Sequence, residues 1–290
     1  MNITLALGGG GAKGNSHIGV IRQLEKENIK IEAIAGTSFG GLVAIFYGLG
    51  NSPDQIEEMF AALDQTQLYG FAPNEEPSLL GLAGVTKWLN EVIGEKTFDD
   101  LNIPCAITAS DLQCGCEVLL TKGLLVDAIL ATIAVPGIFP ARRIGEWKLV
   151  DGGTLDPVPV APARALNPSL PVVAVVLTTP MGVPAQTWNI PIPEYFPRQL
   201  IERISKMRYA QALDIFSRSL DMVTRAVTEY RLEADKPEII LRPQVTDLDL
   251  LERVDVHAVA KKGEEVVEAA LPEIKKLFTW QNRLRRAIQK

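Results

Sequence analysis

A serine on a sharp turn between a strand and a helix is the feature that most constrains this chain. Residues 36–40 read G-T-S-F-G, directly after the apolar run 31–35 and directly before the small and apolar residues 41–49. On such a turn the serine is lifted clear of the sheet on a strained backbone, and the flanking glycines give the chain the space and the φ freedom that it needs. The placement suits a nucleophile, so Ser38 is the first candidate for a catalytic residue.

The first fifty residues alternate strand and helix patterns. An apolar run at 3–7 ends in four glycines, helix-spaced apolar residues follow at 16–28, and the run 31–35 leads to the Ser38 turn. This alternation is typical of a parallel sheet that is covered by helices. Further strands are expected at 105–109, 117–121, 148–150, 172–177 and 238–242. The sequence therefore predicts an α/β fold. We expect a single domain over residues 1–290, with a helical C-terminal portion from about residue 198.

The composition is that of a globular protein. Hydrophobic residues make up 47% and charged residues 22% of the chain, and both values are ordinary for a folded domain. A formal net charge of −6 argues against a nucleic-acid partner, because a binding face would have to concentrate positive charge. The N-terminal residues lack the basic segment and the long apolar core that mark a signal peptide. The sequence also has no stretch of ~18 uncharged apolar residues that could span a membrane. We therefore expect a cytoplasmic protein.

The chain has three cysteines, a small and odd number that does not suit a disulfide framework. Cys105, Cys114 and Cys116 fit a reducing compartment better, where they would be small buried side chains. A zinc site would need further ligands at suitable spacing, and the two histidines, His17 and His257, lie far from the C-x-C in sequence. We therefore expect no bound metal.

Three later segments bear on membranes and partners. Residues 180–197 hold five prolines among aromatic and aliphatic residues, which predicts a packed surface loop, with a lid or a membrane-touching segment as the alternative. Between 198 and 231 the spacing of apolar residues predicts a core-facing helical stripe, although a dimer helix would show the same pattern: Leu213, Phe216, Leu220, Val223 and Val227. Residues 272–290 form an amphipathic helix candidate whose basic face we interpret as solvated, with attraction to anionic lipid as the alternative. A homo-oligomer and peripheral membrane contact stay open.

A glycine-rich loop follows the first predicted strand. Residues 9–14 read G-G-G-A-K-G and match G-x-G-x-x-G between a strand and a helix, the pattern of a dinucleotide-binding loop. That interpretation also needs an acidic residue at the end of the second strand, where this chain has the Ser38 turn instead. The alternative is that the N–H groups of Gly9, Gly10 and Gly11 bind an oxyanion at a helix N-terminus. We favour the oxyanion hole, because loops that follow neighbouring strands lie side by side.

The base for Ser38 is the next question, because the chain has only two histidines. His17 lies in the first turns of a helix and His257 lies in a charged C-terminal region beside Asp255, so neither is well placed for a triad. Asp151 is the better candidate, since it ends a short strand and precedes two glycines that let other groups approach closely. An ordinary Asp-Gly turn stays open as an alternative, and so does a triad of Ser38, Asp151 and His257.

Together these residues resemble the patatin-like phospholipase family, in particular its compact bacterial members. Four motifs match in order: the glycine motif 9–14, the nucleophile turn 36–40, the proline motif 134–140 (A-V-P-G-I-F-P) and the D-G-G at 151–153. The resemblance implies a three-layer α/β/α sandwich with a mostly parallel central sheet, a dyad of Ser38 and Asp151 without histidine, and no cofactor. Lys13 stands where arginine is commoner in the family, and Asp156 stands where asparagine is usual. The resemblance marks as supporting residues Lys13, Gly14, Gly36, Gly40, Gly152 and Gly153.

We therefore expect a serine hydrolase that cleaves a carboxylic ester of a lipid, of the phospholipase A or lysophospholipase type. The reaction would pass through an acyl-enzyme on Ser38, with Asp151 as the base. A general carboxylesterase or thioesterase would use the same dyad. From other classes of protein, a dinucleotide-binding module and an interaction protein on the same scaffold stay open. The expected partner is a lipid or acyl-ester substrate.

Overall fold

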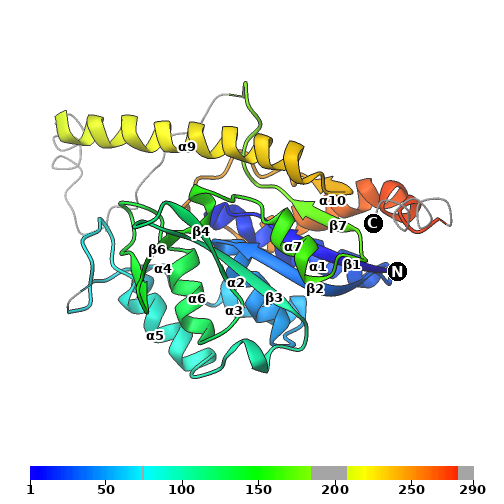
Figure 1. The fold of residues 1–290 in the computed structure, drawn as a ribbon, viewed down its shortest axis with the longest axis horizontal. Coiled ribbons are helices and arrows are strands. Elements are labelled where there is room, and N and C mark those ends of the chain that lie inside the picture. The colour runs from blue at the N-terminus through cyan, green and yellow to red at the C-terminus, as the bar shows by residue number, and fades with distance from the viewer. Residues whose placement is uncertain (74, 184–207, 280–290) are drawn as a thin grey trace.

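The computed structural model describes residues 1–73, 75–183 and 208–279. In this part of the chain a mixed sheet of eight strands forms the middle layer, and helices cover both of its faces (Figure 1). The architecture confirms the α/β fold that the alternating patterns predict. The strands are β1 (Asn2–Leu7), β2 (Lys30–Thr37), β3 (Cys105–Asp111), β4 (Cys116–Leu120), β5 (Arg142–Ile144), β6 (Trp147–Asp151), β7 (Val172–Val175) and β8 (Ile239–Leu241).

The helices form two layers. One face of the sheet carries the larger set, which is α1 (Ser16–Lys26), α2 (Phe39–Gly48), α3 (Pro53–Ala61), α4 (Gln65–Leu68), α5 (Ala83–Val92), α6 (Leu125–Thr132) and α10 (Val256–Lys276). The other face carries α7 (Val160–Leu166) and the long α9 (Arg208–Asp235). Short 3-10 turns follow β1 (η1, Gly11–Asn15), precede β3 (η2, Phe98–Asp100) and follow β6 (η3, Gly152–Thr154).

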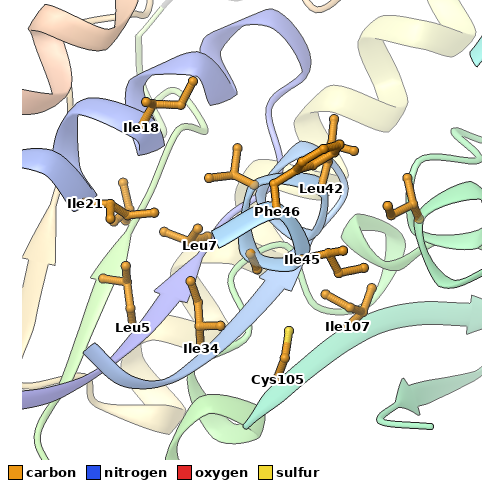
Figure 2. Packing of buried hydrophobic residues seen from close by; sticks show 14 of the residues in the cluster. Leu5, Leu7, Ile18, Ile21, Ile34, Leu42, Ile45, Phe46, Cys105 and Ile107 are labelled. Atoms are coloured by element: carbon orange, nitrogen blue, oxygen red, sulfur yellow. The ribbon is translucent and has the colours of Figure 1, made fainter. Parts of the chain in front are cut away.

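Alternate residues of the central strands face opposite layers, as expected for strands that are buried on both sides. Leu5 and Leu7 of β1 point into the larger core together with Phe46 of α2 (Figure 2). Ala6 points to the other face, into a cluster of small residues that includes Ala35, Ala106 and Ala174. A fully buried Leu or Phe side chain contributes ~1.5–3 kcal/mol, so most of the apolar stabilisation comes from the larger core. The alanines let α7 approach the sheet closely.

Two strands of opposite direction meet end to end beside β3. β2 is parallel to β3, and its last pair is Thr37 with Thr108; β6 is antiparallel to β3, and its last pair is Asp151 with Ala109. β4 pairs with residues 107–111 of β3, which include residues that pair with β2 and residues that pair with β6. β4 must therefore lie along the other edge of β3, so β2 and β6 both lie along the same edge. The C-terminal ends of β2 and β6 therefore lie next to each other, and so do the turns that follow them.

Part of the apolar stripe of α9 is exposed to solvent. Phe216 and Val223 are 57% and 53% exposed, whereas Arg225 and Thr228 are buried on the side that faces the sheet. Arg225 also donates a hydrogen bond of 2.9 Å to the carbonyl of Val183. The prediction of a core-facing stripe was therefore wrong for Phe216 and Val223, because regular spacing shows that side chains share a face and not where that face points. Of the other stripe residues, Leu220 and Val227 are half-buried, and the side chain of Leu213 lies outside the described part.

Two predicted segments fall partly outside the described residues. Of the proline-rich segment 180–197, only residues 180–183 are described. α10 begins at Val256 rather than at Pro272, which lies inside it, and the helix predicted at 272–290 is described only as far as residue 279. Over the stretches 1–73, 75–183 and 208–279, we find no helix that is both long and apolar enough to cross a membrane.

The cysteines depart from their prediction. Cys105 is buried in β3 and carries a free thiol, as expected for a small core side chain. Cys114 and Cys116, however, are exposed, and a disulfide joins them. The expectation of small buried side chains was wrong for this pair, because Cys114 lies in the turn between β3 and β4 and Cys116 begins β4 at the exposed end of that hairpin.

Candidate active site

Ser38 occupies a strained position between the end of β2 and the start of α2. Its φ of 55° and ψ of −127° lie in a region that residues other than glycine rarely adopt. A β-carbon on Gly40 would lie 2.3 Å from the carbonyl oxygen of Leu7, so the turn needs glycine there. The N–H of Ser38 donates a hydrogen bond of 2.7 Å to the hydroxyl of Thr132, which holds the turn in place.

The hydroxyl of Ser38 points to the carboxylate at the end of β6. Ser38 Oγ donates a hydrogen bond of 2.6 Å to Asp151 Oδ2. The other carboxylate oxygen, Oδ1, accepts a hydrogen bond of 2.7 Å from the N–H of Gly153, and the Asp151 N–H donates to the carbonyl of Ala134 at 2.9 Å. Ser38 and Asp151 are only 8% and 6% exposed. The carboxylate is therefore held against the serine in a site that is nearly closed to bulk water.

Burial changes the basicity of this carboxylate. Removal from water raises the pKa of Asp151 from 3.8 to about 6, and the hydrogen bonds from Ser38 and Gly153 act in the opposite direction. A carboxylate with a pKa near 6 is a stronger base than an ordinary aspartate and is still ionised at neutral pH. The arrangement can therefore take a proton from the serine hydroxyl without a histidine between them.

The glycine loop after β1 lies against the Ser38 turn. A β-carbon on Gly9 would lie 3.2 Å from the β-carbon of Ser38. The N–H of Gly9 donates to the carbonyl of Pro157 at 3.0 Å, so this group is already in use. Within the described residues, the N–H groups of Gly10 and Gly11 have no protein acceptor. The predicted set of three oxyanion donors is therefore reduced to Gly10 and Gly11.

Neither histidine contacts the candidate nucleophile or base in the described part of the chain. His17 is fully buried, and its Nε2 lies 2.8 Å from the carbonyl oxygen of Gly8, at the base of the glycine loop. Burial lowers the pKa of His17 to about 4, so the ring is neutral and donates from Nε2. His257 Nδ1 contacts the carboxylate of Glu57. The alternative of a triad through His257 therefore has no geometric support.

The remaining motif glycines lie where neighbouring atoms leave no room for a side chain. A β-carbon on Gly14 would lie 2.3 Å from the ring of Phe39, and one on Gly152 would lie 2.3 Å from the hydroxyl of Thr108 in β3. Within the two turns themselves, a β-carbon would lie 2.5 Å from the carbonyl oxygen of Gly40 at Gly36 and 3.0 Å from the carboxylate of Asp151 at Gly153. Larger residues would therefore displace the serine turn from the glycine loop at Gly14, and the turn after β6 from β3 at Gly152.

Two charged residues of the motifs lie close to the site. Lys13 is half-buried and lines the same cavity as Ser38 and Asp151, and burial lowers the pKa of its ammonium group. Asp156 is fully buried, and burial, reinforced by the charge of Glu117, raises its pKa to about 8. Its backbone carbonyl accepts a hydrogen bond of 2.9 Å from the hydroxyl of Thr37, the residue before Ser38. Asp156 therefore connects the two turns through its main chain.

Two cavities meet at Ser38. One, of about 160 Å³, is mostly apolar and is lined by side chains that include Phe39, Leu42, Phe60, Trp88 and Phe139. The other, of about 120 Å³, is lined by the glycine loop, Lys13, Asp151 and Thr178, among others. Both linings are mostly apolar, and the second also presents the charged side chain of Lys13, so an ester bound at Ser38 has apolar space on both sides and a cation on one.

Sequence reasoning missed the cavity lining and the role of Thr132. The lining residues come from segments that are distant in sequence, so no local pattern announces them. Thr132 lies two residues before the proline motif 134–140, which is the only signal that could have pointed to it. Within the described residues, Asp111, Cys114 and Cys116 come together at the β3–β4 turn, but the two cysteines are joined in a disulfide and offer no thiolate to a metal.

Comparisons with known proteins give a family model, sequence relatives and a solved structure. The family model described as Patatin-like phospholipase matches residues 5–164. An uncharacterized NTE family protein of Mycobacterium tuberculosis is 30% identical over 275 residues, which cover 90% of this chain and 74% of that protein. Lysophospholipase NTE1 of Mycosarcoma maydis is 29% identical over 178 residues, which cover 58% of this chain but only 9% of that protein. VipD from Legionella pneumophila gives a TM-score of 0.49 at 12% identity, covering 93% of this chain and 66% of VipD.

Proposed function

We propose that this chain, which belongs to the patatin-like phospholipase family, hydrolyses acyl esters of lipids with Ser38 as the nucleophile and Asp151 as its base. Membership of the family supports lipid acyl hydrolysis in general. The observation that carries the finer proposal is the 2.6 Å hydrogen bond from Ser38 Oγ to a buried carboxylate. Because burial raises the pKa of that carboxylate to about 6, it can act as a general base near neutral pH.

In the first half-reaction Ser38 Oγ attacks the ester carbonyl while its proton passes to Asp151 Oδ2. The N–H groups of Gly10 and Gly11 stabilise the negative charge that develops on the carbonyl oxygen, and a single donor of this kind is typically worth ~3 kcal/mol in a hydrolase. When the tetrahedral intermediate collapses, the proton moves from Asp151 to the leaving alcohol. The acyl group is then bonded to Ser38.

In the second half-reaction water takes the place of the alcohol. Asp151 removes a proton from this water, which attacks the acyl-enzyme, and the resulting intermediate collapses to a fatty acid and free Ser38. The same two residues therefore serve both halves of the cycle. The pKa of Asp151 lies close enough to neutrality for it to accept the proton in one step and return it in the next.

The substrate class follows from the two cavities at Ser38. The apolar cavity suits one acyl chain, and the cavity beside Lys13 suits the polar part of the ester. The similarity to a protein named as a lysophospholipase supports lysophospholipids as substrates to be tested first.

A lipid panel tests this proposal. Purified wild type, Ser38→Ala and Asp151→Asn would be incubated with phospholipids, lysophospholipids and short-chain esters, and the released fatty acids would be measured. We expect release by the wild type only. Ser110→Ala is a matched control, because Ser110 is also a buried serine beside β6 but its hydroxyl has no hydrogen-bond partner among the described residues. Full activity in Asp151→Asn would refute the dyad, and activity confined to short-chain esters would refute a lipid substrate.

A further inference from the structure

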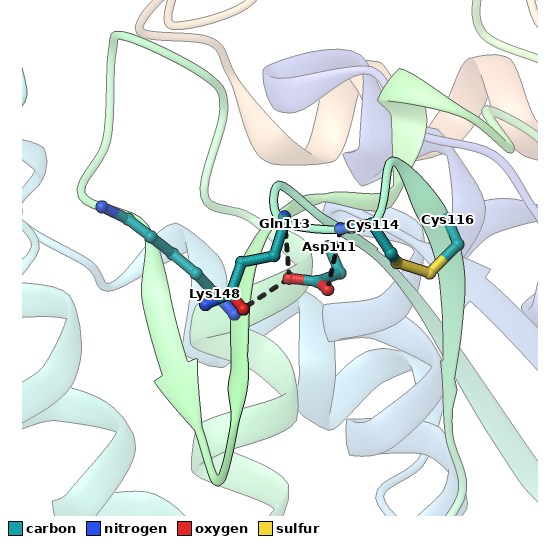
Figure 3. The surroundings of a disulfide bond; sticks show 5 residues. All are labelled: Asp111, Gln113, Cys114, Cys116 and Lys148. Atoms are coloured by element: carbon teal, nitrogen blue, oxygen red, sulfur yellow. Dashed lines mark hydrogen bonds between the residues drawn. A yellow bond between two sulfur atoms is a disulfide. The ribbon is translucent and has the colours of Figure 1, made fainter.

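The turn between β3 and β4 carries a pair of sulfur atoms that the proposed hydrolysis does not use. Cys114 and Cys116 flank Gly115, whose φ of 66° lets the chain reverse, and a disulfide joins them (Figure 3). Both cysteines are exposed. Below them lies the buried carboxylate of Asp111, the last residue of β3. We propose that this pair is a reversible thiol–disulfide exchange site whose co-reactant is a low-molecular-weight thiol.

The short separation of the two cysteines favours exchange over a permanent cross-link. A disulfide stabilises a fold mainly by restricting the unfolded chain, and the gain is smallest for the shortest loops. The bond between Cys114 and Cys116 closes a loop with a single residue between them. Opening it therefore lowers the free energy of unfolding only slightly. Because both cysteines are exposed, a small thiol can reach their sulfur atoms.

Asp111 holds the turn on which the pair lies. Its carboxylate accepts hydrogen bonds from the N–H groups of Gln113, Cys114 and Lys148, and one of its oxygens lies within 4.8 Å of the sulfur atoms (Figure 3). These hydrogen bonds anchor the backbone of the turn to the end of β3 and do not involve the sulfur atoms. Opening the disulfide therefore leaves them in place.

Cys105, at the start of β3, provides an internal reference. It is buried in β3, and burial raises the pKa of its thiol to about 12, so it is not a nucleophile near neutral pH. Exchange chemistry is thus confined to the exposed pair.

The chemistry of the site balances with two equivalents of a small thiol. The thiolate of the first attacks one protein sulfur, breaks the Cys114–Cys116 bond and forms a mixed disulfide, and the other cysteine leaves as a thiolate that is then protonated. The second small thiol attacks the mixed disulfide. The products are two protein thiols and one small-molecule disulfide, so two electrons pass from the small thiols to the protein.

The test counts thiols in the full-length folded protein. Samples would be equilibrated in buffers with different ratios of reduced to oxidised glutathione, quenched with acid, denatured, alkylated with a maleimide and weighed by intact mass spectrometry. We expect one alkylated cysteine in oxidising buffers and three in reducing buffers, with one transition between them. Three alkylated cysteines at every ratio would overturn the proposal because no disulfide forms, and one at every ratio would overturn it because the bond does not exchange.

Variants assign the transition to residues. Cys105→Ala should keep the two-thiol transition, whereas Cys114→Ser should replace it by a mixed disulfide with glutathione at Cys116, located by peptide mapping. A transition lost in Cys105→Ala would refute the assignment of the pair. Ester hydrolysis is not measured, so this proposal and the proposed function fail independently.

Discussion

The substitution Asp151→Asn should have opposite effects on activity and on stability. Asparagine can still accept the hydrogen bond from Gly153 through its amide oxygen and can donate to Ser38 Oγ through its amide nitrogen, so both contacts of the carboxylate are replaced. It cannot act as a base. Hydrolysis should therefore fall by ~10³-fold or more, while a buried ionised group disappears from the folded protein.

The stability effect has a defined magnitude and pH dependence. The pKa of Asp151 rises from 3.8 to about 6 on folding, so the folded protein binds more protons than the unfolded chain between these values, and the free energy of unfolding falls as the pH rises through this window. With 1.36 kcal/mol for each pH unit, the ionised carboxylate costs ~3 kcal/mol at pH 8 and ~1 kcal/mol at pH 4.5. Asp151→Asn removes this cost. It should stabilise the protein by up to these amounts, and by ~2 kcal/mol more at pH 8 than at pH 4.5.

Urea unfolding of the wild type and Asp151→Asn, followed by circular dichroism at both pH values, measures this difference directly. Using the difference between two pH values cancels any change in packing that the substitution causes at both. If Asp151→Asn has the same effect on the free energy of unfolding at pH 8 and at pH 4.5, folding does not raise the pKa of the carboxylate, and the reasoning about its basicity is wrong.

Four further outcomes are expected. The kcat/KM of ester hydrolysis should rise about tenfold per pH unit below pH ~6 and level off above it, because Asp151 must be deprotonated; a stopped-flow or pH-stat profile without this limb would contradict its role. His17→Leu should lower kcat ~10-fold with little change in KM, because the glycine loop loses the donor that holds it, and His17→Gln should retain more activity in the same assay. Thr132→Val should lower the free energy of unfolding by ~1–3 kcal/mol by leaving a buried N–H unpaired, whereas Thr132→Ser should not, as urea titration would show. Gly40→Ala should prevent stable folding, because its β-carbon would lie 2.3 Å from a backbone oxygen, and a circular dichroism spectrum of the purified variant checks this.

Short sequence patterns predict much of the α/β fold and the main residues of the candidate site. The turn at Ser38 could be recognised because strand, glycine and helix signals lie within fifteen residues of one another. Asp151 could be proposed because it stands between a strand and two glycines. The contact between Ser38 and Asp151 depends on β2 and β6 sharing one edge of β3, and the sequence does not show this pairing.

Features that depend on distant segments could not be predicted. The engagement of the Gly9 N–H depends on a carbonyl at Pro157, far along the chain, so the sequence could not show which glycine donors stay free. The orientation of α9 involves contacts with distant segments, such as the hydrogen bond from Arg225 to the carbonyl of Val183, which the spacing of apolar residues does not reveal. The pairing of Cys114 with Cys116 depends on the conformation of a turn, whereas the prediction considered only the number of cysteines.

Labelling of Ser38 with a fluorophosphonate is the most direct test of the central claim, that Asp151 activates Ser38 without a histidine. The rate of covalent labelling would be measured for the wild type, Asp151→Asn and His257→Ala at pH 8, and the modified residue would be located by peptide mass spectrometry. The account predicts labelling at Ser38 alone, at least ~100-fold slower in Asp151→Asn and unchanged in His257→Ala. Labelling at another residue, or an equal rate in Asp151→Asn, would contradict it.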